Sequence, residues 1–174
     1  MRKYVLPALL LFLFILESMS VDFFGLHNFH EDWIIVPRFM LIVIVLCAIY
    51  TSPYVGLICA MLFGFLYDVV YTEILGVYLF AFGISVYIVS SILRFVNTNY
   101  LISFLMVLVS ISITEHLVFG IHSLIGTTEL THSDFLSIRM VPTLIFNAII
   151  ALILLFPIKL FMERLAIEQK DELT

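Results

Sequence analysis

Long apolar runs separated by short polar stretches cover almost the whole chain. An α-helix needs roughly 20 mostly apolar residues to cross the hydrocarbon core of a bilayer, and the runs are close to that length. The predicted spans are residues 4–24, 34–50, 54–71, 75–93, 100–125 and 138–161. The pattern therefore predicts an all-α polytopic membrane helix bundle of about six transmembrane helices, with residues 1–174 as a single integral membrane domain.

The third span contains a stripe of small residues that leads to an acidic one. Gly56, Ala60, Gly64 and Asp68 are four residues apart, so they lie on one face of a helix. In lipid, helices associate through close backbone packing at small residues and through polar pairs. We expect this helix to lie at the centre of the bundle.

Composition supports a membrane protein and argues against a soluble domain or a nucleic-acid-binding protein. The chain has 63% hydrophobic and only 12% charged residues, far from the values of a soluble domain. Its net charge of -5 gives no reason to expect a nucleic-acid partner. Cys47 and Cys59 lie inside apolar runs without CxxC spacing, so we expect buried small hydrophobic residues rather than a disulfide or metal site.

Basic residues indicate the orientation of the spans. An even number of spans places both termini on one side, and Lys and Arg mark the cytoplasmic side. The basic residues on the terminal side are Arg2, Lys3, Arg94, Lys159, Arg164 and Lys170. Arg38 and Arg139 are left towards the other face, so both termini are predicted to be cytoplasmic.

Several ionisable residues fall inside the spans at a similar depth. With this topology all of them lie in the outer half of the bilayer: Glu17, Arg38, Asp68, Glu115, His116 and Arg139. Such charges are costly in lipid and are expected to face the protein interior and to find partners. Arg38 and Asp68 lie near the outer ends of adjacent antiparallel spans, so an ion pair between them is expected.

This intramembrane polar cluster allows two readings. It can be a closed structural girdle that holds the bundle in register, or the lining of an outward-facing pocket. Arg38 and Arg139 could also extend to lipid headgroups. Full pairing without a cavity would favour the girdle, whereas a pocket of several hundred Å³ with an unpaired arginine would favour ligand binding.

The sixth span offers polar groups for contacts between helices. Thr143 and Asn147 are four residues apart and share a face, and a proline at 142 costs little in the first turns of a helix. The residues expected to pack helices together are Gly56, Ala60, Gly64, Gly76, Pro142, Thr143 and Asn147.

Candidate catalytic and metal motifs are weak. The HxxHED run at residues 27–32 lacks a matched set of further ligands, so a solvated loop is preferred to a metal site. Asp68 after a tyrosine has no second mid-span aspartate with which to divide acid and base roles. We expect no enzyme activity, cofactor or metal.

The order of motifs resembles one family along nearly the whole chain. The matching features are the six predicted spans, the VPRF run at residues 36–39, the GFLYD run at 64–68 followed by Leu75 and Gly76, and the span-six pattern of Arg139, Pro142, Thr143 and Asn147. Together they resemble the bacterial rod-shape-determining protein MreD family, and the compact loops are similar to its Gram-positive branch.

The resemblance implies a non-enzymatic role in the machinery that builds lateral cell wall in rod-shaped bacteria. It implies a place beside MreC and a link between MreB filaments and the RodA glycosyltransferase with its transpeptidase partner, surrounded by membrane lipids. It also implies a fold similar to the six-helix substrate-binding components of energy-coupling-factor transporters, whose pocket opens outward. The alternative function is accordingly an outward-facing small-molecule or lipid-headgroup binding protein or a transporter component.

Overall fold

The computed structural model describes the backbone of residues 5–23 and 33–171 and the side chains of residues 5–20 and 33–162. The elements are α1 (Val5–Phe23), α2 (Phe39–Tyr50), α3 (Pro53–Tyr71), α4 (Val77–Ile92), α5 (Tyr100–Ile125), α6 (His132–Asp134), the π-helix η2 (Phe135–Met140) and α7 (Val141–Asp171). No strand occurs in these ranges, so the predicted all-α bundle is confirmed. The loop of residues 27–32 and the basic residues near both termini lie outside the described side chains.

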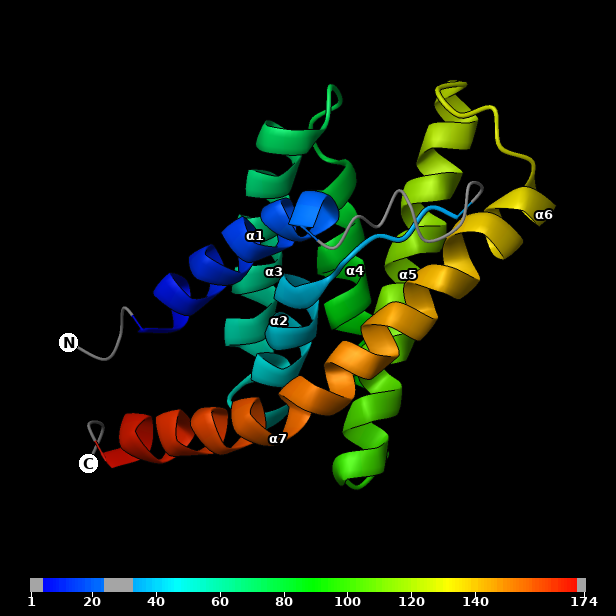
Figure 1. Cartoon of the computed structure of the whole chain (residues 1–174). Helices are drawn as coiled ribbons and strands as arrows, with labels where there is room; N and C mark the ends of the chain where they lie inside the picture. The colour runs from blue at the N-terminus through cyan, green and yellow to red at the C-terminus, as the bar shows by residue number, and fades with distance from the viewer. Residues whose placement is uncertain (1–4, 24–32, 172–174) are drawn as a thin grey trace.

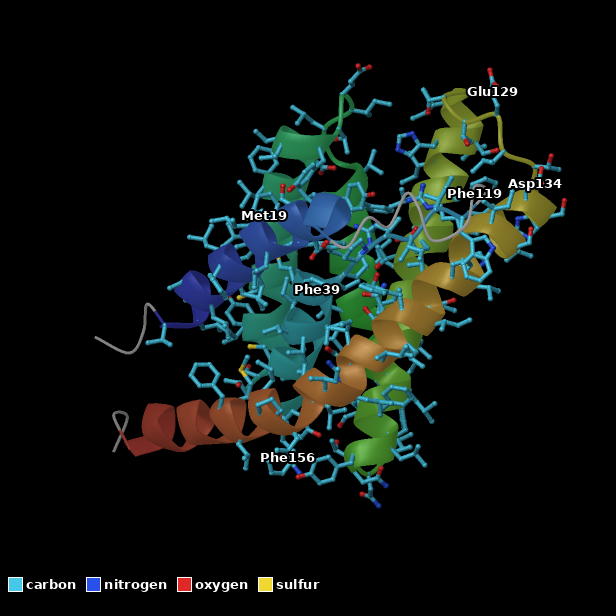
Figure 2. The ribbon with its side chains drawn as sticks, in the orientation of Figure 1. Met19, Phe39, Phe119, Glu129, Asp134 and Phe156 are labelled. Atoms are coloured by element: carbon cyan, nitrogen blue, oxygen red, sulfur yellow. The ribbon has the colours of Figure 1, made fainter. Side chains whose placement is uncertain are left out.

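Three helical stretches are long and apolar enough to cross a membrane, judged by length and composition. They are Pro53–Tyr71, Tyr100–Ile125 and His132–Met162, the last formed by α6, η2 and α7 without a break. The shorter apolar helices are Val5–Ser20, Phe39–Tyr50 and Val77–Ile92. The bundle exposes large apolar side chains, among them Met19 of α1 and Phe156 of α7, each 60% exposed (Figure 2). These outer faces suit a hydrocarbon environment.

Local sequence explains several helix ends. Pro53 occupies the first turn of α3, where its missing N–H costs nothing. The side chain of Asn99 caps α5 by accepting a hydrogen bond from the Ile102 N–H at 2.8 Å. Gly126 ends α5 with φ 78°, the left-handed conformation that glycine adopts without strain. Pro157 lies inside α7, which changes direction towards its C-terminal end (Figure 1).

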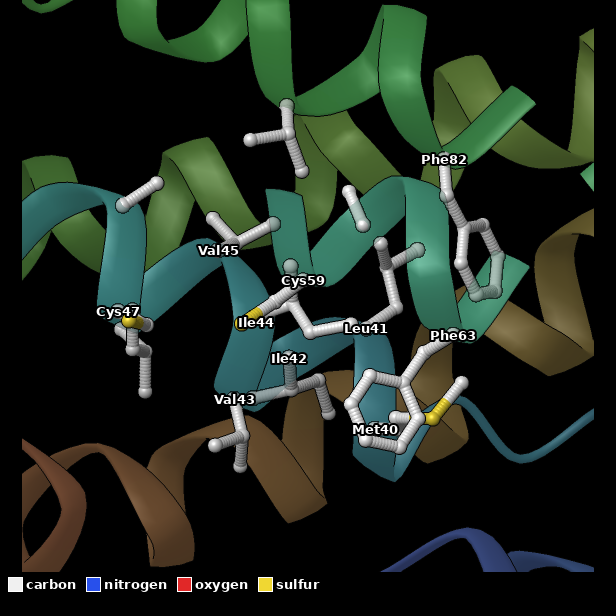
Figure 3. Packing of buried hydrophobic residues seen from close by; sticks show 14 of the residues in the cluster. Met40, Leu41, Ile42, Val43, Ile44, Val45, Cys47, Cys59, Phe63 and Phe82 are labelled. Atoms are coloured by element: carbon white, nitrogen blue, oxygen red, sulfur yellow. The ribbon is translucent and has the colours of Figure 1, made fainter. Parts of the chain in front are cut away.

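The centre of the bundle is α2 rather than α3. Every residue from Met40 to Ala48 is buried, and α2 packs against α1, α3, α4, α5 and α7. Figure 3 shows its side chains among Cys59 and Phe63 of α3 and Phe82 of α4. The expectation that α3 is central is wrong, because α3 buries one stripe and exposes the opposite face. Burial on all sides is typical of a core helix.

The second predicted span begins later than its apolar run suggested. Residues 33–38 are not helical, and α2 starts only at Phe39 (Figure 1). At 12 residues α2 is about 18 Å long, which is shorter than the hydrocarbon core. The non-helical segment, residues 33–38, precedes α2 and lies along η2, where the Ile34 N–H donates to the Ile138 carbonyl at 2.9 Å.

The small-residue stripe of α3 lies at two helix contacts. A Cβ added to Gly56 would lie 2.7 Å from the Ala48 Cα of α2, and one added to Gly64 would lie 2.7 Å from the Tyr78 carbonyl oxygen of α4. Gly56, Ala60, Gly64 and Asp68 are all buried. The stripe therefore brings the backbones of α2 and α4 against that of α3.

Replacing Gly64 with alanine should destabilise the bundle by about 1–3 kcal/mol, because a Cβ there overpacks the contact with the α4 backbone. Gly83→Ala on α4 is the matched control. Its Cβ would meet Met61 Cγ at an ordinary 3.7 Å, so this helical glycine should tolerate alanine or gain up to about 1 kcal/mol. The measurement is the thermal unfolding midpoint in detergent, and equal midpoints for the two variants would contradict the close contact.

Candidate functional site

The buried charges of the bundle centre on Glu115 of α5. Its Oε1 accepts hydrogen bonds from Arg38 Nη2 at 2.6 Å and Arg38 Nε at 2.8 Å, and its Oε2 accepts from Arg139 Nε at 3.0 Å. Arg38 and Glu115 are fully buried, and the Arg139 side chain is 24% exposed. One carboxylate therefore joins the start of α2, α5 and η2 through charge-assisted hydrogen bonds.

Aromatic side chains enclose the guanidinium of Arg38. Its Cζ lies 4.9 Å from the ring centroid of Tyr78 and 5.5 Å from that of Tyr67, and Nη2 also donates to the Tyr78 hydroxyl at 3.1 Å. Cation–π contacts of this kind are strongest when desolvated. Nη1 is buried without a hydrogen-bond partner in the described part of the chain. The tyrosines were not expected from the sequence, although Tyr67 adjoins Asp68 and lies one turn beyond Gly64.

Glu17 of α1 accepts a hydrogen bond from the start of α2. Its Oε2 accepts from the Met40 N–H at 3.1 Å and its Oε1 accepts from the Tyr67 hydroxyl at 2.7 Å. The first N–H groups of a helix have no partner within the helix, and a carboxylate there is also favoured by the helix dipole. Glu17 therefore satisfies α2 from a neighbouring helix and connects to Arg38 through the Tyr67 ring.

Asp68 does not pair with Arg38, so the expected ion pair is wrong. Its carboxylate accepts hydrogen bonds from the backbone N–H groups of Gly76 at 2.9 Å, Tyr78 at 2.7 Å and Leu79 at 3.0 Å. These N–H groups belong to the start of α4, which has no side-chain cap of its own. Asp68 thus caps α4 from the end of α3, and it is fully buried there.

Gly76 has a conformational role in this turn. Its φ is 104°, a value that L side chains rarely adopt, and nothing lies within 4 Å of the position that a Cβ would take. The residue expected to pack helices instead lets the chain turn so that its N–H meets Asp68. The turn and the cap therefore depend on each other.

His116 lies apart from the other predicted cluster residues. Its side chain is exposed, Nδ1 is 2.8 Å from the Ser112 carbonyl oxygen, and its ring contacts Phe135 at a centroid distance of 5.3 Å. Adjacent residues of a helix point in different directions, so Glu115 and His116 cannot both face the core. The structure brings Glu17, Arg38, Glu115 and Arg139 together, places Asp68 at the neighbouring cap and leaves His116 outside.

Thr143 and Asn147 bind the backbone of the non-helical segment. Asn147 Oδ1 accepts from the Arg38 N–H and Nδ2 donates to the Val36 carbonyl, both at 2.8 Å. Thr143 Oγ1 accepts from the Val36 N–H at 3.1 Å and donates to the Ile34 carbonyl at 3.3 Å. Non-helical backbone at membrane depth is tolerated where protein satisfies it. These side chains replace the helix hydrogen bonds that residues 33–38 do not make.

Pro142 leaves a backbone carbonyl of the preceding turn free to bind the non-helical segment. It has no N–H to donate to Ile138 four residues earlier, and the Ile138 carbonyl accepts instead from the Ile34 N–H. Pro142 is buried directly after the π-helix η2. Thr143 and Asn147 thus bind the non-helical segment, whereas the sequence had suggested that they form contacts between helices.

A cavity opens beside the buried charges. It has a volume of about 300 Å³ and lies between the ends of α3, α4 and α5 and η2. Its polar lining includes Thr72, Glu73, Tyr78, His122 and Arg139. Arg139 therefore links the buried carboxylate of Glu115 to this space. No group of three or more His, Cys, Asp or Glu side chains is placed to hold a metal ion within the described ranges.

Removing the carboxylate of Asp68 should cost more than about 2 kcal/mol of unfolding free energy in Asp68→Ala, because three N–H groups lose their acceptor. Asp68→Asn keeps one acceptor oxygen and should cost less. Thermal unfolding in detergent ranks the two variants, and an added Arg38→Met substitution should not restore Asp68→Ala. Restoration would support the rejected ion pair.

Comparisons with known proteins agree along the chain. A family model described as "rod shape-determining protein MreD" matches residues 2–165. A protein of Bacillus subtilis (strain 168), "Rod shape-determining protein MreD", is 33% identical over 172 residues, which cover 99% of this chain and all of that protein. No solved structure matches.

Proposed function

The chain belongs to the MreD family of rod shape-determining proteins, and we propose that it acts as a non-enzymatic membrane scaffold of the cell-elongation machinery. In this proposal the chain binds MreC directly. It contacts MreB, RodA and the elongation transpeptidase either directly or through MreC. No nucleic acid, cofactor or metal takes part.

The observation that supports a scaffold most strongly is how the buried polar groups are used. Glu17, Asp68 and Asn147 bind backbone groups of other segments, and Glu115 binds two arginines. These contacts fix helices relative to one another, which is what a rigid docking frame requires. The exposed apolar faces of the outer helices then offer van der Waals contact to partner helices and to lipid.

We also propose that residues 1–174 form one membrane domain that crosses the bacterial cell membrane six times with both termini in the cytoplasm. The shorter helix α2 crosses together with residues 33–38. The excess of basic residues on the terminal side supports this orientation.

The test is purification of the tagged chain in detergent from its own bacterium, with identification of proteins and lipids in the eluate. We expect stoichiometric MreC together with elongation enzymes. Exposed apolar residues of single helices, such as Ile15 of α1 and Ile153 of α7, are then replaced by tryptophan to locate the face that MreC binds. Purification without MreC, under conditions that retain the bundle, would contradict the scaffold.

A ligand-binding function is the second candidate, and the cavity beside Arg139 favours it. Its volume of about 300 Å³ suits a small polar molecule or a headgroup, and Arg139, His122 and Tyr78 could bind an anionic group there. A defined small molecule that copurifies with the chain and is lost in Arg139→Gln would support this function. His116→Gln, on the same side of the bundle but outside the cavity lining, is the control.

A further inference from the structure

Two cavities lie next to each other along the outer surface between α3 and α4. One, of about 280 Å³, is lined by apolar side chains that include Met61, Phe80 and Gly83. The other, of about 260 Å³, is lined by Tyr54, Ser90 and Arg94 among others. Leu57 and Tyr87 line both, so the two cavities adjoin, and together they are called here the α3–α4 groove.

The α3–α4 groove is amphipathic along its length. Its α4 C-terminal end has the Arg94 guanidinium and the hydroxyls of Tyr54, Ser90 and Ser91, and no acidic residue lines either cavity. Ser90 Oγ is buried there without a hydrogen-bond partner in the described chain. The other end is almost entirely apolar, and Gly83 keeps it open. A ligand that fits must carry an anionic or polar group at one end and a hydrocarbon chain at the other.

The length of the α3–α4 groove is close to that of one leaflet of a bilayer. From Phe80 to Ile92, the last residue of α4, is 12 residues or about 18 Å at about 1.5 Å per residue, and Arg94 lies in the turn that follows. Half of a bilayer including its headgroup layer is about 20–22 Å. A phospholipid whose headgroup lies at Arg94 would therefore place its acyl chain along Leu57, Gly83 and Phe80.

We propose that the α3–α4 groove is a binding site for a phospholipid with an anionic headgroup, from the leaflet at the Arg94 end. The phosphate contacts Arg94 and the hydroxyls of Ser90 and Tyr54, and an acyl chain fills the apolar part beside Gly83. A partner helix would bury the apolar part, whereas a phosphate group supplies acceptor oxygens for the Arg94 guanidinium and the Ser90 hydroxyl together. Arg94 is on the cytoplasmic side in the proposed topology, where anionic lipids give the leaflet its negative potential.

The experiment uses the full chain in nanodiscs of equal parts phosphatidylglycerol and phosphatidylcholine, followed by mild detergent extraction and native mass spectrometry of the retained lipid. The unmodified chain should retain phosphatidylglycerol in preference to phosphatidylcholine. Arg94→Gln should lower that preference about fivefold, the effect of one basic residue near an anionic leaflet. Gly83→Phe should remove the retained lipid of both kinds, because its ring fills the acyl part of the α3–α4 groove.

Two matched variants serve as controls. Gly83→Ala adds a Cβ that meets Met61 at 3.7 Å, so it should retain lipid as the unmodified chain does. Lys159→Gln removes a basic residue that lies over the Tyr100 ring and does not line the α3–α4 groove, so it should keep the preference.

Equal retention by the unmodified chain, Arg94→Gln and Gly83→Phe would overturn the proposal. The same equality together with loss of MreC from Gly83→Phe would assign the α3–α4 groove to a protein helix instead. Because Arg94 is exposed, its substitution should leave folding intact, and an unchanged thermal midpoint verifies this. The recovery of MreC with Arg94→Gln is measured in the same way. If Arg94→Gln keeps both MreC and the lipid preference, the groove proposal fails and the scaffold stands, whereas an unmodified chain that recovers no MreC contradicts the scaffold.

Discussion

Replacing Glu115 with leucine is expected to lower the free energy of unfolding by about 3–5 kcal/mol, the usual cost of breaking a buried ion pair. Glu115 accepts hydrogen bonds from Arg38 and Arg139, and Arg38 has no exposure through which water could take over. The substitution leaves a buried guanidinium without its counter-charge. The measurement is reversible unfolding in detergent micelles, followed by circular dichroism.

The neighbouring residue gives the control for Glu115→Leu. His116→Leu changes the next position of α5, but this side chain is exposed and outside the buried charges, so the effect should be within about 0.5 kcal/mol. Arg139→Leu should also cost less than Glu115→Leu, because Arg139 is partly exposed and its loss leaves Glu115 paired with Arg38. Equal stability of Glu115→Leu and His116→Leu would contradict the role assigned to Glu115.

Asn147→Leu is the second substitution with a large expected effect, about 2–6 kcal/mol. It leaves the Arg38 N–H and the Val36 carbonyl without partners, and each buried unpaired group costs about 1–3 kcal/mol. Residues 33–38 should detach from α7. Trp33 lies at the start of this segment and is the single tryptophan of the chain, so its fluorescence emission reports the detachment directly.

Ile149→Leu is the matched control for Asn147→Leu. It places leucine on the exposed face of α7, where Ile149 is 55% exposed, and should change neither stability nor Trp33 emission. Unaltered Trp33 emission in Asn147→Leu would mean that the amide does not hold the segment.

The sequence predicted the helices well, because long apolar runs have few alternatives in a membrane. It also singled out Glu17, Arg38, Glu115 and Arg139, which the structure brings together, but it grouped the exposed His116 with them. It failed to identify the partner of Arg38. Asp68 is close to Arg38 in the predicted topology, but the choice of partner depends on how helices are rotated, and a carboxylate can equally cap a helix.

The main error in the predicted fold was to treat residues 34–38 as part of a helix. The hydrophobicity of the run from Ile34 does not reveal the break, because hydrophobicity does not distinguish helix from extended chain. Two signals point to it in retrospect. Pro37 disfavours helical conformation at Val36, and Thr143 with Asn147 presents hydrogen-bonding groups at a spacing that can serve a neighbouring backbone. Neither signal identifies the segment that Thr143 and Asn147 bind, because their contacts with Val36 and Arg38 join residues more than 100 positions apart.

Arg38 pairs with Glu115 and so fixes residues 33–38 and the start of α2 to α5. A double-mutant cycle on unfolding free energy tests it, using Arg38→Met, Glu115→Leu and the combined variant. The combined loss should be smaller than the sum of the single losses by up to about 3 kcal/mol, whereas the losses from Arg38→Met and Asp68→Asn should add within about 0.5 kcal/mol. Additivity for Arg38 with Glu115, and strong coupling for Arg38 with Asp68, would contradict it.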